Sequence, residues 1–244
     1  DYSAGLEQSI EGLRVGIPKE FFSSHLNDGV AATVSAAIKE LEAAGAVIVD
    51  VSLPSTDLGV STYYVIAPAE ASANLSRYDG VRYGYRCDSP SDLQDLYLRS
   101  RTEGFGEEVK RRILIGTFTL SAASYDQYFM KAQQVRRLIA EEYQSVLKDV
   151  DVIAGPSAPN TAFVLNDDSK SITDMYMEDV FTIGANLAGL PAISVPAGMI
   201  NGLPVGMQLI GSRFGEARLL NIAHQFQRRT DWHSLTPNLE GLTG

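Results

Sequence analysis

The sequence predicts an α/β protein in which a mixed β-sheet is packed against helices and carries a thick helical insertion. Three observations support this fold class: a strand–helix–strand pattern in residues 13–54, a long and mostly helical stretch from about residue 57 to 148, and two late strands joined by a turn containing Asn201-Gly202. The first pattern favours parallel pairing, because a β-α-β unit normally crosses over onto a parallel sheet. The late turn favours an antiparallel hairpin, so the sheet is predicted to be mixed.

The first β-α-β unit has clear boundaries. LRVGIPKEFF begins with a short strand that Pro18 stops. Asn27 or Asp28 can cap the following helix, and Gly45 is a natural stop at its end. Residues 46–54, AVIVDVSLP, then form a valine-rich strand. The apolar positions of the helix recur at helical spacing and predict its buried face: Val30, Val34, Ala37, Ile38 and Leu41.

The helical stretch is interrupted near the loop SRYDGVRYGYRCDSPSD, and the elements after it alternate. A helix is predicted near 124–147, then a short buried strand within 150–159, a helix at about 173–188, the late hairpin, and a final helix at about 215–229. The helix near 124–147 has an apolar face at helical spacing: Tyr128, Ala132, Val135, Leu138, Ile139 and Tyr143. No internal repeat or convincing domain linker is evident, so one domain is predicted for residues 1–244.

Composition narrows the class of protein. Of the 244 residues, 45% are hydrophobic and 20% charged, which is ordinary for a globular core, and no apolar run approaches the roughly 20 residues of a membrane span. The net charge of −10 argues against a nucleic-acid surface on this chain. Cys87 is the single cysteine, which excludes an internal disulfide and fits a reducing, cytoplasmic location. The chain begins Asp-Tyr-Ser, and we expect it to be the downstream part of a longer protein.

No metal or nucleophile motif is recognisable. The three histidines lie far apart, HExxH is absent, and one cysteine cannot build a thiolate zinc site, so no metal is expected. His224 is expected to pack or cap a helix. The acidic stretch 166–174 lacks EF-hand spacing, and there is neither a P-loop nor a GxSxG elbow. Ser157 in GPSAP has no histidine nearby in sequence and is a poor candidate nucleophile.

The stretch EVKRRILIGTF places two adjacent arginines at the start of an apolar helix. On a helical wheel, Arg112 falls on the apolar face, whereas Arg111 falls on the opposite side, within reach of Glu107 for a surface ion pair. The residues that share the face of Arg112 are Phe105, Val109, Ile113, Gly116 and Leu120.

Further apolar residues on the other sides of this helix, Leu114, Ile115 and Phe118, suggest that it is enclosed. A guanidinium on a covered face needs an anionic partner, because burying a lone charge costs several kcal/mol or more. Arg112 therefore either forms an internal salt bridge or grips the carboxylate of a substrate in a bidentate fork.

Several segments resemble one enzyme family. NLAGLPAISVPAGMINGLPVGMQLIG at 186–211 is similar to the carboxy-terminal hallmark of the amidase signature family. LRVGIPKEFF, EASANLSRYDGVRYGYR, RTEGFGEEVKRRILIGTF, DVIAGPSAP and MEDVFTIGANLAGLPAISVP resemble, more narrowly, the A subunits of the glutamyl-tRNA(Gln)/aspartyl-tRNA(Asn) amidotransferases. The resemblance covers nearly the whole chain. It implies a mixed β-sheet with helices on both faces, here lacking its amino-terminal part.

The resemblance also implies where the chemistry lies. The family hydrolyses amides with two serines and a lysine, which sit in segments that this sequence does not contain, so no catalytic residue is expected in this chain. The family's glutamine-binding residues match Tyr63 in STYYVIA, Arg112 in KRRILIGTF and Asp179 in MEDVFTIG. Arg112 suits the α-carboxylate of glutamine and Asp179 its α-ammonium group. Tyr64 remains an alternative to Tyr63, and a plain Arg112–Asp179 salt bridge would leave the same trace in the sequence.

The function implied is that of the glutamine-hydrolysing subunit of an amidotransferase. Its ammonia would pass to the partner B and C subunits, with ATP and Mg used by the partner, no cofactor on this chain, and tRNA bound only through the partner. Two alternatives stay open: a stand-alone amidase of the same family, and a catalytically empty binding or scaffold fragment. The rest of the 186–211 hallmark is expected to be structural, and the side chain of Gln208 to satisfy backbone groups.

Overall fold

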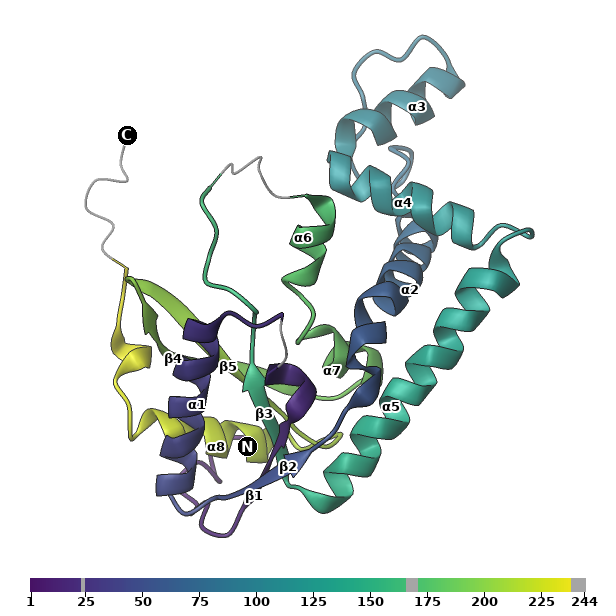
Figure 1. Cartoon of the computed structure of the whole chain (residues 1–244). Coiled ribbons are helices and arrows are strands. Elements are labelled where there is room, and N and C mark those ends of the chain that lie inside the picture. The colour runs from purple at the N-terminus through teal and green to yellow at the C-terminus, as the bar shows by residue number, and fades with distance from the viewer. Residues whose placement is uncertain (23–24, 166–170, 238–244) are drawn as a thin grey trace. The chain divides into compact units, whose positions relative to one another are not determined.

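The structure, a computed structural model, describes residues 1–22, 25–165 and 171–237, and it divides the chain into two compact units (Figure 1). Unit 1 consists of residues 1–60 and 138–244 and contains the β-sheet, whereas unit 2 consists of residues 61–137 and is built from helices. The assignment of residues 1–244 to a single domain stays a prediction. In the described part of the chain, no helix is both long enough and apolar enough to cross a membrane.

The sheet of unit 1 is mixed, as predicted. Its five strands lie in the order β2-β1-β3-β5-β4. β1 pairs in parallel with both β2 and β3, whereas β5 pairs antiparallel with β3 and with β4. The strands span Arg14–Pro18 (β1), Val47–Val51 (β2), Val152–Pro156 (β3), Ala192–Ile200 (β4) and Leu203–Ile210 (β5).

The turn between β4 and β5 is the predicted hairpin. Asn201 and Gly202 have φ angles of 50° and 82°, and Ile200 pairs directly with Leu203. Both central residues thus occupy the left-handed region that a tight two-residue hairpin turn needs, which asparagine and glycine tolerate best.

Helix α1 (Asp28–Ala43) follows the sequence prediction closely. The side chain of Asn27 accepts hydrogen bonds from the backbone N–H groups of Gly29 and Val30, and Gly45 follows the helix with a φ of 97°. The five apolar positions predicted for its inner face are all buried. The capping residues and the apolar spacing were therefore sufficient to predict this helix from its own sequence.

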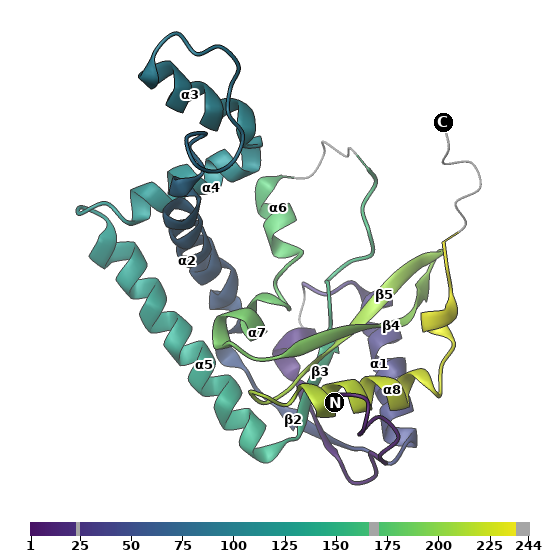
Figure 2. The ribbon, with the colours of Figure 1, turned by 180° about the vertical axis from the view of Figure 1, so that it is seen from behind.

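Helices lie on both faces of the sheet (Figures 1 and 2). α1 packs against β3, β4 and β5, and α8 (Glu216–Gln227) packs against β4 and β5 on the same side, where Arg229 is paired with Glu40 of α1. The opposite side is covered near Gly155 and Gln208 by the rings of Phe21 and Phe181, which contact each other at a tilted angle. The predicted two-sided architecture is confirmed.

The single helix predicted at about 173–188 is wrong: two short helices occupy this region, α6 (Ile172–Met177) and α7 (Ile183–Ala188). The backbone between them makes i→i−3 turns, and the Phe181 carbonyl accepts a hydrogen bond of 2.7 Å from the side chain of Gln208. A partner from β5 therefore replaces the helical partner of this carbonyl, which the sequence around 173–188 did not indicate.

Unit 2 and its borders contain α2 (Gly59–Asn74), α3 (Leu93–Gly104), α4 (Glu107–Thr119) and α5 (Lys131–Asp149). A π-helix at Tyr125–Met130 precedes α5, so the regular α-helix starts later than predicted. On its predicted apolar face, Ala132, Ile139 and Tyr143 are buried, but Tyr128 and Leu138 are exposed.

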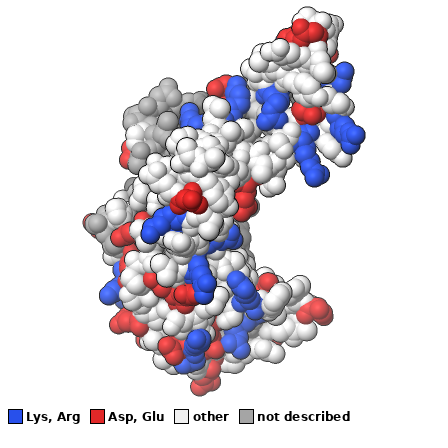
Figure 3. Space-filling view, turned by 90° about the vertical axis from the view of Figure 1, so that its right-hand side faces the viewer, with Lys and Arg blue, Asp and Glu red and all other residues white. Residues whose placement is uncertain are grey.

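The amino-terminal segment is fixed to α8. The amide of Asn221 donates to the carbonyls of Leu6 and Gln8, and Glu7 pairs with His224 and Arg228. His224, which was expected to pack or cap, binds the carboxylate of Glu7, and its hydrogen bond, more than the charge of Arg228, lowers the pKa of Glu7. Figure 3 shows one face of the molecule, where charges of both signs are interspersed; the acidic excess lies in unit 1.

Candidate functional site

Helix α4 crosses α2 at an unusually short distance. A Cβ atom added to Gly116 would lie 1.9 Å from the carbonyl oxygen of Pro68 in α2, so only glycine permits this approach. Arg112 lies one turn before Gly116 on the same face of α4, and Tyr63 lies a little over one turn before Pro68 on α2. The crossing thereby brings the side chains of Arg112 and Tyr63 together, and it confirms that Arg112 shares the face of Gly116.

The guanidinium of Arg112 has three neighbours within unit 2. Its Nε donates to Glu108 Oε1 at 3.1 Å, and its Nη1 donates to the Tyr63 hydroxyl at 3.3 Å. Its central carbon lies 5.8 Å from the centre of the Tyr64 ring, which is within the range of a cation–π contact. Among the described residues, Nη2 has no hydrogen-bond partner, so the edge formed by Nη1 and Nη2 can receive a carboxylate end-on.

The surroundings keep Arg112 charged. Its side chain is 33% exposed. Burial acts to lower the pKa of Arg112, but the hydrogen bond to Glu108 and the neighbouring Tyr63 hydroxyl outweigh it, so the pKa lies above its ordinary value. A permanently charged, half-buried guanidinium is suited to anchoring an anionic ligand group.

Arg111 behaves as a surface residue, although with a different partner from the one predicted. It pairs with Glu108 at 2.6 Å, whereas Glu107 pairs with Lys110. The expected enclosure of α4 is also wrong for this structure, since Leu114 and Phe118 are 71% and 57% exposed.

The two adjacent tyrosines play different parts. The Tyr63 hydroxyl reaches Arg112, while Tyr64 offers its ring to the same guanidinium and stands edge-on to the Tyr63 ring, with 5.0 Å between the ring centres. In the structure, the Tyr63 hydroxyl accepts from Arg112, whereas Tyr64 meets the same guanidinium with its ring; the choice of Tyr63 as a glutamine-binding residue stays a prediction. The structure also adds Tyr64 and Glu108 to the surroundings of Arg112, and the i,i+4 spacing of Glu108 and Arg112 was a signal for the latter.

Asp179 belongs to unit 1 and lies in the turn between α6 and α7. Its side chain is exposed and its carboxylate has no hydrogen bond among the described residues, whereas the neighbouring Glu178 accepts one from Asn160 at 3.3 Å. The structure thus brings Tyr63 and Arg112 together within one unit, whereas Asp179 lies in the other unit with an exposed side chain.

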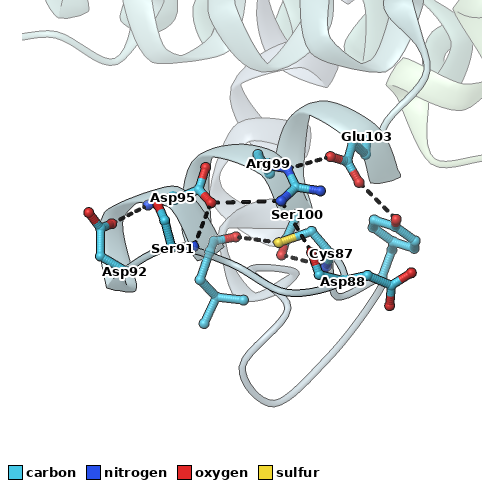
Figure 4. Close-up of polar contacts among 10 residues, drawn as sticks. Cys87, Asp88, Ser91, Asp92, Asp95, Arg99, Ser100 and Glu103 are labelled. Carbon is cyan, nitrogen blue, oxygen red and sulfur yellow. Dashed lines mark hydrogen bonds and ion pairs between the residues drawn. The ribbon is translucent and has the colours of Figure 1, made fainter.

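A second polar cluster in unit 2 has a structural explanation (Figure 4). The Ser100 hydroxyl accepts from the Cys87 N–H at 3.1 Å, and the Cys87 thiol lies against the Leu96 carbonyl. Arg99 and the Tyr85 hydroxyl both bind Glu103 and lower its pKa, the hydroxyl having the larger effect. These contacts fasten the 78–92 loop to α3. Among the described residues, no group of three or more His, Cys, Asp or Glu side chains is arranged to hold a metal; residues 166–170 of the acidic stretch lie outside them.

Comparison with known proteins identifies the family. The family model described as Amidase matches residues 1–220. The chain belongs to the amidase family. The A subunit of glutamyl-tRNA(Gln) amidotransferase from Nitrosococcus oceani is 58% identical over 237 residues, and its counterpart from Saccharophagus degradans is 60% identical over 237 residues. In both cases the match covers 97% of this chain but 49% of the relative. The chain thus spans about half the length of the curated relatives it matches.

A solved structure agrees with the amidase fold. The crystal structure of the A subunit of glutamyl-tRNA(Gln) amidotransferase from Thermotoga maritima superposes with a TM-score of 0.72 and 41% identity, covering 96% of this chain and 46% of that one. The mixed sheet with helices on both faces is therefore an amidase-signature architecture, present here in part.

The surroundings of Ser157, the serine of GPSAP, contain a second serine. The Ser157 hydroxyl lies 2.7 Å from that of Ser194, and Gly206 leaves room for both. Among the described residues, the side chain that Ser157 binds is thus another hydroxyl, which is not a general base. Gln208 donates to the carbonyls of Pro156 and Phe181, as predicted for a residue that satisfies backbone groups.

Proposed function

We propose that this amidase chain supplies the glutamine-recognition part of the ammonia-donating subunit of a tRNA-dependent amidotransferase, which converts Glu-tRNA(Gln) or Asp-tRNA(Asn) into Gln-tRNA or Asn-tRNA. The observation that carries the proposal is the guanidinium of Arg112, which is held beside the Tyr63 hydroxyl with its Nη2 group unpartnered among the described residues. The names of the relatives that match 97% of the chain support the same assignment.

The proposed recognition follows from the charges of free glutamine. Its α-carboxylate would bind the Nη1–Nη2 edge of Arg112 and accept a further hydrogen bond from Tyr63, and its α-ammonium group would bind the exposed carboxylate of Asp179. The side-chain amide would then be directed away from these three residues, toward two serines and a lysine that the family resemblance expects outside this sequence. Alone, the chain would bind substrate groups without hydrolysing glutamine.

The remaining steps belong to the rest of the assembly. Ammonia would pass to the partner B and C subunits, which would bind tRNA and use ATP and Mg to activate the acyl group. The chain itself would need no cofactor. The acidic excess of unit 1 agrees with tRNA being held elsewhere. The cytoplasmic location stays a prediction from the sequence.

An ammonia bypass tests this proposal in the complete enzyme. Arg112→Met should reduce the formation of Gln-tRNA or Asn-tRNA from glutamine at least tenfold, yet leave formation from added ammonium chloride unchanged, because ammonia does not need the glutamine site. Lys110→Met is the matched control, since it removes from the same helix a cation that, within the described residues, pairs with Glu107 and the Thr102 carbonyl. Unaltered glutamine-dependent synthesis in Arg112→Met would refute the proposal, and absence of any tRNA product in the wild type would favour a stand-alone amidase.

A further inference from the structure

Glu108 occupies a central position beside the proposed glutamine site. One carboxylate oxygen, Oε1, accepts from Arg112 Nε at 3.1 Å, and the other, Oε2, accepts from Arg111 Nη1 at 2.6 Å. The Glu108 side chain is 43% exposed, and it lies in the first turn of α4. A single carboxylate thus bridges two arginines of very different surroundings.

This bridge determines which edge of Arg112 is available. A guanidinium can receive a carboxylate along its Nε side or along its Nη1–Nη2 end. Because Glu108 takes Nε and the Tyr64 ring lies against the guanidinium, the group is fixed in rotation, and its end edge is presented next to the Tyr63 hydroxyl. Without Glu108, the flexible arginine side chain would have to be ordered at each binding event.

The charges of the group also fit a carboxylate ligand. Glu108 by itself would repel an incoming carboxylate, but Arg111 offsets its charge on the solvent side, so the three side chains together carry one net positive charge. Glu107, by contrast, is also in the first turn of α4, but it pairs with Lys110 and its side chain is 86% exposed. Both glutamates thus lie in the first turn of α4, but Glu107 pairs with a lysine and Glu108 with two arginines.

We propose that Glu108 is a positioning residue that orients Arg112 for the substrate carboxylate. The inference rests on the proposed function, because it assumes that Arg112 binds the carboxylate of glutamine. Glu108 itself would not touch the substrate. Its contribution would appear as weaker binding of glutamine and not as a slower chemical step.

The test compares Glu108→Ala with Glu107→Ala in the complete enzyme. Both variants remove an acidic side chain from the first turn of the same helix, so they share any loss from the helix dipole. We expect Glu108→Ala to raise KM for glutamine about three- to tenfold with kcat nearly unchanged, whereas Glu107→Ala should resemble the wild type. Glu108→Gln retains an acceptor for Arg112 Nε and should recover part of the loss.

A second substrate separates positioning from general damage. 4-Aminobutanamide is glutamine without its α-carboxylate, so its kcat/KM should be the same in Glu108→Ala and in the wild type. An equal loss for both substrates, or a glutamine KM equal to that of Glu107→Ala, would overturn the inference. If Arg112→Met raises KM for glutamine and Glu108→Ala does not, only this inference fails; if Arg112→Met has no effect, the proposed function fails with it.

Discussion

The crossing of α2 and α4 can be tested with a single methyl group. In Gly116→Ala, the new Cβ would lie 1.9 Å from the Pro68 carbonyl oxygen and 2.4 Å from its carbonyl carbon. Ordinary contact begins at 3.4 Å, so the two backbones must separate by about 1.5 Å at this point. Neither backbone atom can rotate out of the way, unlike the end of a flexible side chain.

Much of this displacement should reach Arg112, one turn away. Its bond to the Tyr63 hydroxyl is already long, at 3.3 Å, and a further shift of this size would break it. We expect a loss of stability of about 1–3 kcal/mol from overpacking. We also expect KM for glutamine to rise about tenfold or more, because misplacing a binding group by about 1 Å is costly.

The assay combines steady-state kinetics with thermal unfolding in the complete enzyme. Gly106→Ala is the matched control: it makes the same substitution at the start of α4, where no atom lies within 4 Å of the new Cβ and φ is −65°. A Gly116→Ala enzyme with lower thermal stability but a wild-type KM for glutamine would refute the idea that the crossing sets the position of Arg112.

Three other predictions concern single side chains. Asp179→Asn should raise KM for glutamine, because the α-ammonium group loses its counter-ion, but should leave hydrolysis of 4-carbamoylbutanoate, which lacks that group, unaffected; equal losses on both would argue against the assignment. Gln208→Leu should lower the free energy of unfolding by about 2–4 kcal/mol in urea titrations, because the carbonyls of Pro156 and Phe181 lose their donor; a loss below about 1 kcal/mol would contradict this. For Glu20, burial raises the pKa, but hydrogen bonds from the Leu53 N–H and the Ser52 hydroxyl outweigh burial, so the pKa in the folded state lies below its ordinary value of 4.5. The stability that the Glu20 carboxylate contributes is therefore fully present above pH 4.5 and is lost as the pH falls through the folded-state pKa. The difference in melting temperature between wild type and Glu20→Gln should therefore shrink from pH 7 to pH 4, with the exposed Glu42→Gln as control, and a constant difference would count against it.

Elements defined by local signals were predicted best. The Asn27 cap, the Gly45 stop and the Asn201-Gly202 turn each depend on a few neighbouring residues, and the structure confirms all three. The region 173–188 was predicted wrongly: i→i−3 turns separate α6 from α7, and within this break the Phe181 carbonyl binds the side chain of Gln208, which is far away in sequence. The spacing of apolar residues within a segment carries no information about a hydrogen-bond partner elsewhere in the chain.

In the candidate site, too, features set by neighbouring residues were predicted better than contacts between separate elements. The helical wheel placed Arg112, and not Arg111, on the face of Gly116, because spacing along the helix alone determines this; that Arg112 binds a ligand stays a prediction. The partner of Arg111 was wrong, because Glu107 and Glu108 are both within helical reach and the choice depends on rotamers and on the Lys110 side chain. The closeness of Tyr63 to Arg112 depends on the crossing of two helices, which the wheel of one helix does not contain.

The proposed function depends above all on whether Arg112 binds the α-carboxylate of glutamine. The measurement is kcat/KM of the complete wild-type enzyme and of Arg112→Met, each with glutamine and with 4-aminobutanamide. We expect the substitution to lower the preference for glutamine by about 30- to 1000-fold, almost entirely through the kcat/KM for glutamine, because only that substrate carries the carboxylate that Arg112 would hold. A loss of equal size on both substrates would contradict this expectation and would reduce Arg112 to a structural ion pair.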